Sequence, residues 1–135
     1  MSFQIPKVSP KWEFDGFEGG PSSHQIVLDW LLVPRNYERW AGLEKNASVS
    51  KVALCREIIR LLNDAKIFTR RESDVTNRIN GWLKSYKEAC AWLETEGATI
   101  RTSGVDDPES VIRFHILTTL KCKHFYEFHP IFEEA

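Results

Sequence analysis

Asparagine, lysine and arginine side chains concentrate in one short part of the chain, between residues 66 and 87. Six basic and two acidic residues lie there, a local net charge of +4 in a chain of 135 residues whose net charge is -1. Asparagine can pair bidentately with adenine in the major groove, while lysine and arginine bind phosphates. This pattern favours a duplex-DNA interface, with a merely solvated helix face as the alternative. The candidate contact residues are Arg70, Arg71, Asn77, Arg78, Asn80, Gly81, Lys84 and Lys87.

Gly81 differs from the rest of this group because it has no side chain to contribute. The residues around it form a helical pattern, and glycine in a helix interior costs about 1 kcal/mol relative to alanine. That cost is explained if another backbone passes close to the helix, so Gly81 is included among the candidate contacts. A glycine that is simply tolerated on an exposed face is the alternative interpretation.

Other motifs that would carry chemistry are missing from the sequence. It contains no G-x-S-x-G elbow, Walker-type glycine loop, dinucleotide glycine fingerprint or H-E-x-x-H pair. Cys122, His124 and His129 form the one cluster of metal-ligand residue types, but their spacing fits no standard zinc finger and their aromatic neighbours indicate packing. We therefore expect no catalytic residue, no metal site and no cofactor, and we predict that the protein is not an enzyme.

The positions of two histidines and one tryptophan relative to the core are less clear from the sequence. His24 and His115 lie in helical patterns without an evident partner, which favours positions at a helix start or at the edge of a core. Trp92 points away from the main apolar stripe of its helix, so it is a candidate contact residue.

The strongest helical pattern of the chain covers residues 73–94, and this helix would present the candidate contacts. Apolar side chains recur in it at alternating spacings of four and three residues, as on the buried face of an amphipathic helix. Either a capping box over Thr69–Glu72 or a cap by Ser73 would begin it. The apolar stripe consists of Val75, Ile79, Trp82, Tyr86, Ala89 and Leu93.

A first helix is expected over residues 23–33. The S-x-x-Q sequence from Ser22 to Gln25 has the form of a capping box at its start, and Pro34 ends it. Residues 36–40 then look like one short turn that delivers Tyr37 and Trp40 to the core.

Two further helices flank the central pattern. The second is expected over residues 50–65, and the fourth opens at Pro108 and runs to residue 120. The tail from residue 124 is aromatic and then acidic. The core-facing stripe of the second helix consists of Val52, Cys55, Ile58, Ile59 and Leu62.

Residues 1–21 are rich in proline and glycine, which predicts an irregular arm. Trp12, Phe14 and Phe17 make this arm apolar enough to pack across the helices, and residues 22–135 are expected to form a single domain. The three cysteines are an odd number and widely spaced, which indicates reduced thiols of an intracellular protein. Neither a signal peptide nor a membrane-spanning segment is indicated.

Several short segments together, in their order and spacing, carry a resemblance to a known family: Trp12–Asp15, Gly19–Ser23, Val27–Leu31, Asn36–Trp40, Asp74–Val75, Ser85–Ala89 and Cys122-x-His124-Phe125. They resemble the Myb/SANT-like DNA-binding domains of fungi and oomycetes. The resemblance implies a three-helix, helix-turn-helix-like core whose third helix reads DNA through Asn77, Arg78, Asn80, Gly81 and Lys84. With the aromatic arm before this core and the additional helix after it, the expected fold is all-α.

The resemblance implies a nuclear protein that regulates transcription or chromatin, or a factor derived from a mobile element, with double-stranded DNA as its partner. Domains of the SANT type often bind proteins instead. A module that binds histone tails or a regulatory protein is therefore the alternative, and the near-neutral net charge of the chain is compatible with it.

Overall fold

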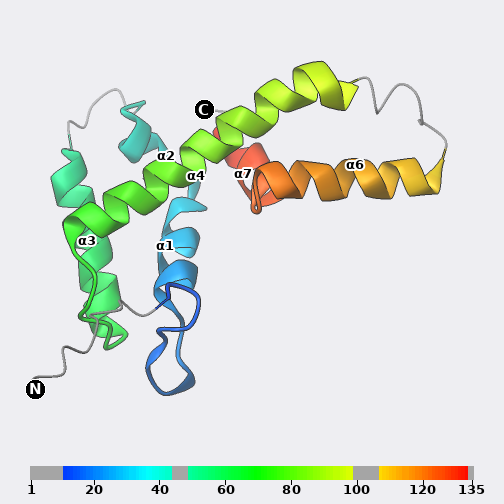
Figure 1. Cartoon of the computed structure of the whole chain (residues 1–135). Coiled ribbons are helices and arrows are strands. Elements are labelled where there is room, and N and C mark those ends of the chain that lie inside the picture. The colour runs from blue at the N-terminus through cyan, green and yellow to red at the C-terminus, as the bar shows by residue number, and fades with distance from the viewer. Residues whose placement is uncertain (1–10, 44–48, 99–106, 134–135) are drawn as a thin grey trace, which may run out of the picture.

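The computed structural model describes residues 11–43, 49–98 and 107–133, and over these ranges the regular structure is entirely helical. Helices α1 (Ser23–Leu31) and α3 (Lys51–Asp64) lie side by side, and α4 (Glu72–Trp92) packs across both of them (Figure 1). Residues 65–71 connect α3 to α4. The all-α prediction is confirmed for the described residues.

The apolar stripe of α4 is the element of the fold that the sequence predicts best. Val75, Ile79 and Ala89 are fully buried, and Trp82, Tyr86 and Leu93 pack against the core at its edge. The stripe of α3 is also confirmed at Cys55, Ile58 and Leu62, whereas Val52 is about half exposed. Val52 lies in the first turn of α3, one turn before the first buried residues of the stripe.

The helix starts follow the expected caps in part. The Ser22 hydroxyl accepts the Gln25 amide at 3.2 Å, but the Gln25 side chain donates to Asp29 and does not close a capping box. The two predicted N-caps of α4, a capping box over Thr69–Glu72 or a cap by Ser73, are wrong. The N-cap is Arg71, whose amide donates to the Asp74 carboxylate at 2.8 Å. In the structure the Ser50 hydroxyl caps α3 and the Asp107 carboxylate caps α6 (Pro108–Lys121).

The expected short turn at residues 36–40 is in fact a helix. Helix α2 (Pro34–Ala41) has Pro34 in its first turn, where proline is favoured, so this residue both ends α1 and begins α2. Gly42 follows in the left-handed conformation (φ 72°), which glycine adopts without strain and which ends α2. Trp40 is buried as expected.

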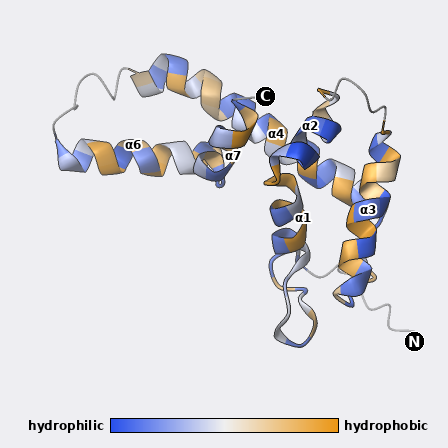
Figure 2. Ribbon diagram, turned by 180° about the vertical axis from the view of Figure 1, so that it is seen from behind, coloured by the Kyte–Doolittle hydropathy of each residue, from blue (hydrophilic) through white to orange (hydrophobic). Residues whose placement is uncertain are grey.

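Beyond the core, α4 and α6 form a long antiparallel hairpin (Figures 1 and 2). The end of α4 widens into a π-helical turn, η2 (Leu93–Gly97), that packs on α6. Trp92 lies on Phe114 of α6 with 6.1 Å between ring centroids, and its ring closely approaches Gly97. The prediction of Trp92 as a contact residue was wrong, since this side chain joins the two arms of the hairpin.

A further helix, α7 (Phe125–Phe132), occupies the aromatic tail and packs on α2 and α4. Phe125, Phe128 and Phe132 are buried in it, and Phe132 stacks on Tyr37 at 4.3 Å. No helix of the described residues combines the length and the apolar character that crossing a membrane requires.

Candidate nucleic-acid interface

The outer face of α4 carries a ridge of four polar side chains. Asn77, Asn80, Lys84 and Lys87 follow one another at spacings of three, four and three residues, which makes them neighbours along the helix surface. All four are exposed, and within the described ranges no hydrogen bond or ion pair engages their side chains. Two amides followed by two ammonium groups therefore face solvent over a length of about 15 Å.

Gly81 lies beside this ridge, in the interior of a 21-residue helix. A Cβ atom built on Gly81 would meet no heavy atom within 4 Å. Packing inside the chain therefore does not require a glycine at this position. The free space leaves the backbone of α4 open to close approach from outside, while the helix carries the propensity cost of the glycine.

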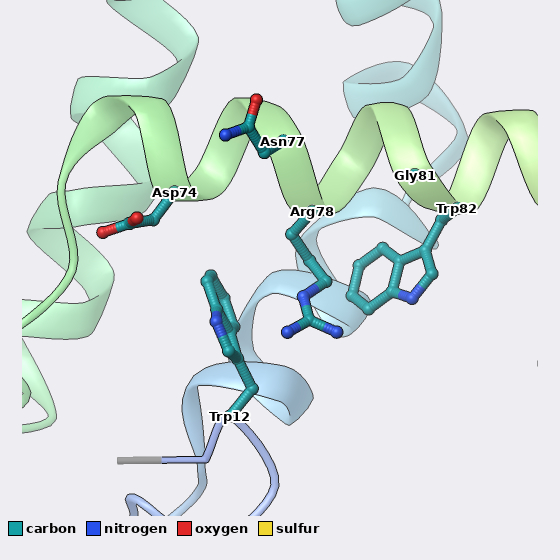
Figure 3. A pocket seen from close by; sticks show the side chains of 6 residues that line it. All are labelled: Trp12, Asp74, Asn77, Arg78, Gly81 and Trp82. Atoms are coloured by element: carbon teal, nitrogen blue, oxygen red, sulfur yellow. The ribbon is translucent and has the colours of Figure 1, made fainter. Parts of the chain in front are cut away.

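Arg78 is turned toward the N-terminal arm and is partly buried. Its guanidinium carbon lies 4.6 Å from the centre of the Trp12 ring, and Figure 3 shows the side chain extending between Trp12 and Trp82. Asn77 points away from these rings in the same view. The pocket around Arg78, of about 330 Å³, is also lined by Asp74 and Gly81. Arg78 therefore borders the exposed face and keeps a positive charge there, but it is held by an aromatic ring of the arm.

Arg70 does not belong to the exposed face, so its prediction as a DNA contact was wrong. Its side chain is only 4% exposed and its Nη2 donates to Asp15 Oδ2 at 2.9 Å. Asp15 is buried to the same degree and also accepts the Ser23 amide at 2.7 Å and the Ser23 hydroxyl. Burial raises the pKa of Asp15, but the hydrogen bonds from Ser23 and Arg70 outweigh it and leave this pKa below its usual value.

The ion pair between Asp15 and Arg70 connects the arm to the loop before α4. The Trp12 ring lies 4.5 Å from the Arg70 guanidinium carbon, so one tryptophan contacts both Arg70 and Arg78. The expected packing of the arm is thus carried by Trp12 and Asp15. Phe14 is 81% exposed and Phe17 is about half exposed, so these two aromatics contribute little to it.

The N-terminus of α4 is already occupied by carboxylates of the chain. Asp74 caps the Arg71 amide, and Glu72 accepts from the Arg56 guanidinium at 3.0 Å. Both carboxylates sit in the first turn, where the positive end of the helix dipole favours them. Arg71 is exposed beside them. A phosphate would meet negative charge at this helix start, so phosphate contacts are expected further along α4 and not at its first turn.

Lys87 stands at the end of the ridge and borders a second pocket, of about 560 Å³, between α2, α3 and α4. Arg39 and Lys51 border the same pocket. Arg39 is paired with Glu57 at 3.1 Å, whereas Lys51 lies 5.3 Å from the centre of the Trp40 ring and has no acidic partner among the described residues. Lys51 and Lys87 together extend the positive charge of the ridge toward α2.

The histidines have partners that no sequence pattern indicated. His24 Nε2 lies 3.0 Å from His124 Nε2, and His124 Nδ1 lies 2.8 Å from Glu127 Oε1. Burial and the neighbouring His124, against the weaker opposing effect of Glu13, lower the pKa of His24. His115 hydrogen-bonds to Tyr126, and His129 to Tyr86 at 2.9 Å.

The described residues contain no group of three or more side chains placed to hold a metal ion. Cys122 is buried and accepts a hydrogen bond from Ser85, and burial raises the pKa of its thiol. The three cysteines are all unpaired thiols. Cys122 and His124 are thus parts of the packing around α7.

Comparisons of the chain with protein-family models, with curated proteins and with solved structures find no significant match. The geometry of the α4 face is therefore the basis on which a function can be proposed.

Proposed function

We propose that the protein binds double-stranded DNA by placing the outer face of α4 in the major groove. In this proposal α1, α3 and α4 form a helix-turn-helix-like core of the Myb/SANT-like type, and α4 is the helix that reads the DNA. A nuclear regulator of transcription or chromatin, or a factor derived from a mobile element, would use such a domain.

The observation that carries the proposal is the ridge of α4 together with the open glycine beside it. The major groove is about 12 Å wide and accepts one α-helix. Asn77 and Asn80 supply the amides that can pair with adenine edges, and Lys84 and Lys87 supply charge for the flanking phosphates. Gly81 removes the side chain that would otherwise hold the helix backbone away from the groove.

The other basic residues have supporting positions in this proposal. Lys51 borders the same pocket as Lys87 and can reach a backbone phosphate there, whereas Arg71 lies beside Glu72 and Asp74 and adds only general positive charge. Arg78 contributes charge from its place on Trp12. Arg70 binds Asp15 and positions the arm, so it has no contact with DNA.

The direct test is the salt dependence of binding to a random-sequence duplex, measured by fluorescence anisotropy between about 50 and 200 mM salt. Affinity should fall steeply, because counterions are released from each neutralised phosphate. Lys84→Ala should weaken binding and reduce the slope of log affinity against log salt by about 1. Arg113→Ala removes the same charge from exposed α6 and should leave the slope unchanged. Absence of binding at the lowest salt would contradict the proposal.

A second candidate is a SANT-like module that binds histone tails or a regulatory protein. The pocket between Trp12 and Trp82 favours it, because aromatic faces beside the Asp74 carboxylate suit a cationic side chain. Arg78 already extends between the two rings, however, and its charge opposes a second cation. Titration with basic tail peptides separates the candidates, since this pocket predicts peptide binding that is lost in Trp12→Ala and unaffected by Lys84→Ala.

A further inference from the structure

Four aromatic side chains line the pocket of about 560 Å³ that Lys87 borders. Phe132 of α7 stacks on Tyr37 of α2 at 4.3 Å and meets Tyr86 of α4 edge-on, with 5.1 Å between ring centroids. Trp40, the fourth, is only 2% exposed. The rings of three helices hold one another in place, so the aromatic part of the pocket is formed without a ligand.

The charged side chains among the described lining residues of this pocket are all positive. They are Arg39, Lys51 and Lys87, in a chain whose net charge is -1. Glu57 neutralises Arg39, but Lys51 and Lys87 are exposed and have no ion-pair partner among the described residues. Trp40 adds an unsatisfied donor to the lining, since its buried Nε1 has no hydrogen-bond partner within the described ranges. The lining therefore has an excess of positive charge and of donors.

We propose that this pocket binds a small organic anion with an aromatic or other apolar body. Pockets of about 300–1,000 Å³ that combine apolar walls with a few polar groups are typical of small-molecule sites. The body of the ligand lies against the aromatic rings, and its anionic group lies at Lys51 and Lys87. The Lys51 ammonium is 5.3 Å from the centre of the Trp40 ring, so charge and apolar surface are within reach of one small molecule.

Binding of DNA alone does not account for these features of the pocket. A backbone phosphate has no apolar body, so it would use the two lysines and leave the aromatic lining empty. The proposed ligand uses both. Its binding is measured without DNA, so the outcome does not depend on the proposed function of the α4 ridge.

The test uses two fluorescent dyes with the same aromatic rings. Anilinonaphthalene sulfonate carries a negative charge, whereas phenylnaphthylamine lacks the sulfonate and is neutral. Both become brighter in apolar surroundings. The full chain should bind the sulfonate dye at one saturable site and the neutral dye at least several-fold more weakly. Absence of saturable binding of the sulfonate dye, or equal affinity for the two dyes, overturns the proposal.

Lysine variants assign the dye to this pocket. Lys51→Ala and Lys87→Ala should each weaken binding of the sulfonate dye at least several-fold, because each removes one charge from the site. Two controls should bind it like the wild type. Arg60→Ala removes the same charge from an exposed position of α3 outside the lining, and Ile116→Ser removes an exposed apolar side chain of α6. Binding that both lysine variants retain, or that Ile116→Ser loses, overturns the proposal. Circular dichroism checks that each variant is folded.

Competition against the sulfonate dye separates the contributions of charge and body. Naphthoate and naphthyl phosphate combine an aromatic body with a carboxylate or a phosphate, and at least one of them should displace the dye. The better competitor identifies the preferred anionic group. Inorganic phosphate at the same concentration has no such body and should displace little. Equal displacement by inorganic phosphate, or none by either aromatic anion, overturns the proposal.

Discussion

At the residue scale, Gly81 links the stability of α4 to its proposed function. A methyl group at this position would meet no neighbour, so alanine would stabilise α4 through its higher helix propensity. The chain has glycine there instead. Selection for helix stability alone would therefore not retain a glycine at the centre of this exposed face.

Gly81→Ala is predicted to stabilise the fold and weaken the binding of DNA. We expect the free energy of unfolding in urea to rise by about 0.5–1 kcal/mol, because alanine favours the helix. Affinity for duplex DNA should fall, and Gly81→Leu should lower it further, because a larger side chain keeps the backbone away from the groove.

Asn63→Ala, in the last turn of α3, is a suitable control for both measurements. A Gly81→Ala variant that is stabilised but binds DNA as tightly as the wild type would show that the backbone of α4 does not approach DNA closely at Gly81.

At the element scale, periodicity could predict the helices that are long and bury one face. The stripe of α4 repeats over six apolar residues, so its position was clear from the sequence. Helix α2 has only eight residues, too few for a period to stand out, and Pro34 was interpreted only as the end of α1. Helix α7 is also short, contains Pro130, and buries aromatic residues that could equally pack from an irregular tail.

The candidate site was predictable to a different extent for each residue. Asn77, Asn80, Gly81 and Lys84 could be placed on one face because they share a helix with a clear apolar stripe. Arg70 could not be assigned correctly, because its partner Asp15 is 55 residues away and the sequence gives no sign of the contact. A lone aspartate among the aromatics of the arm is the one signal that could have indicated a buried partner.

The aromatic contacts of α7 predict that this helix is required for stability. Phe128 is fully buried and stacks on Phe132 at 4.8 Å. Phe128→Ala should lower the free energy of unfolding by about 3–5 kcal/mol, measured by urea denaturation, because it removes buried area and leaves a cavity. Phe14→Ala, at an exposed position, should change it by less than about 0.5 kcal/mol. A similar small effect of Phe128→Ala would mean that α7 is not docked on α2 and α4.

At the scale of the whole molecule, the contact between His24 and His124 joins α1 to the segment before α7. The pKa of His24 is lowered from 6.5 in the folded chain, so the unfolded chain binds a proton at higher pH than the folded one. The stability that this group contributes is complete above about pH 6.5. It is lost as the pH falls through the lowered pKa. Lys123 and Arg78 act in the same direction, and Glu13 opposes them.

The free energy of unfolding should therefore decrease as the pH is lowered from about 7.5 to about 5. His24→Gln cannot be protonated and should flatten this dependence, as measured by urea denaturation at each pH. His115→Gln, at an exposed position on α6, is the control and should retain the wild-type slope. An equal slope in His24→Gln and the wild type would assign the pH dependence to other groups.

The buried ion pair between Asp15 and Arg70 determines where the chain can be truncated without loss of stability. Composition suggests a boundary at residue 22, between an irregular arm and a helical domain. A chain that begins there would keep Arg70 and its charge but lose the Trp12 ring and the Asp15 carboxylate, which also accepts the Ser23 amide. Removing one partner of a buried ion pair typically costs about 3–5 kcal/mol, a large part of the stability of a small domain. Residues 11–21 are thus an integral part of the folding unit, and shortened versions for expression or crystallisation should begin before Lys11.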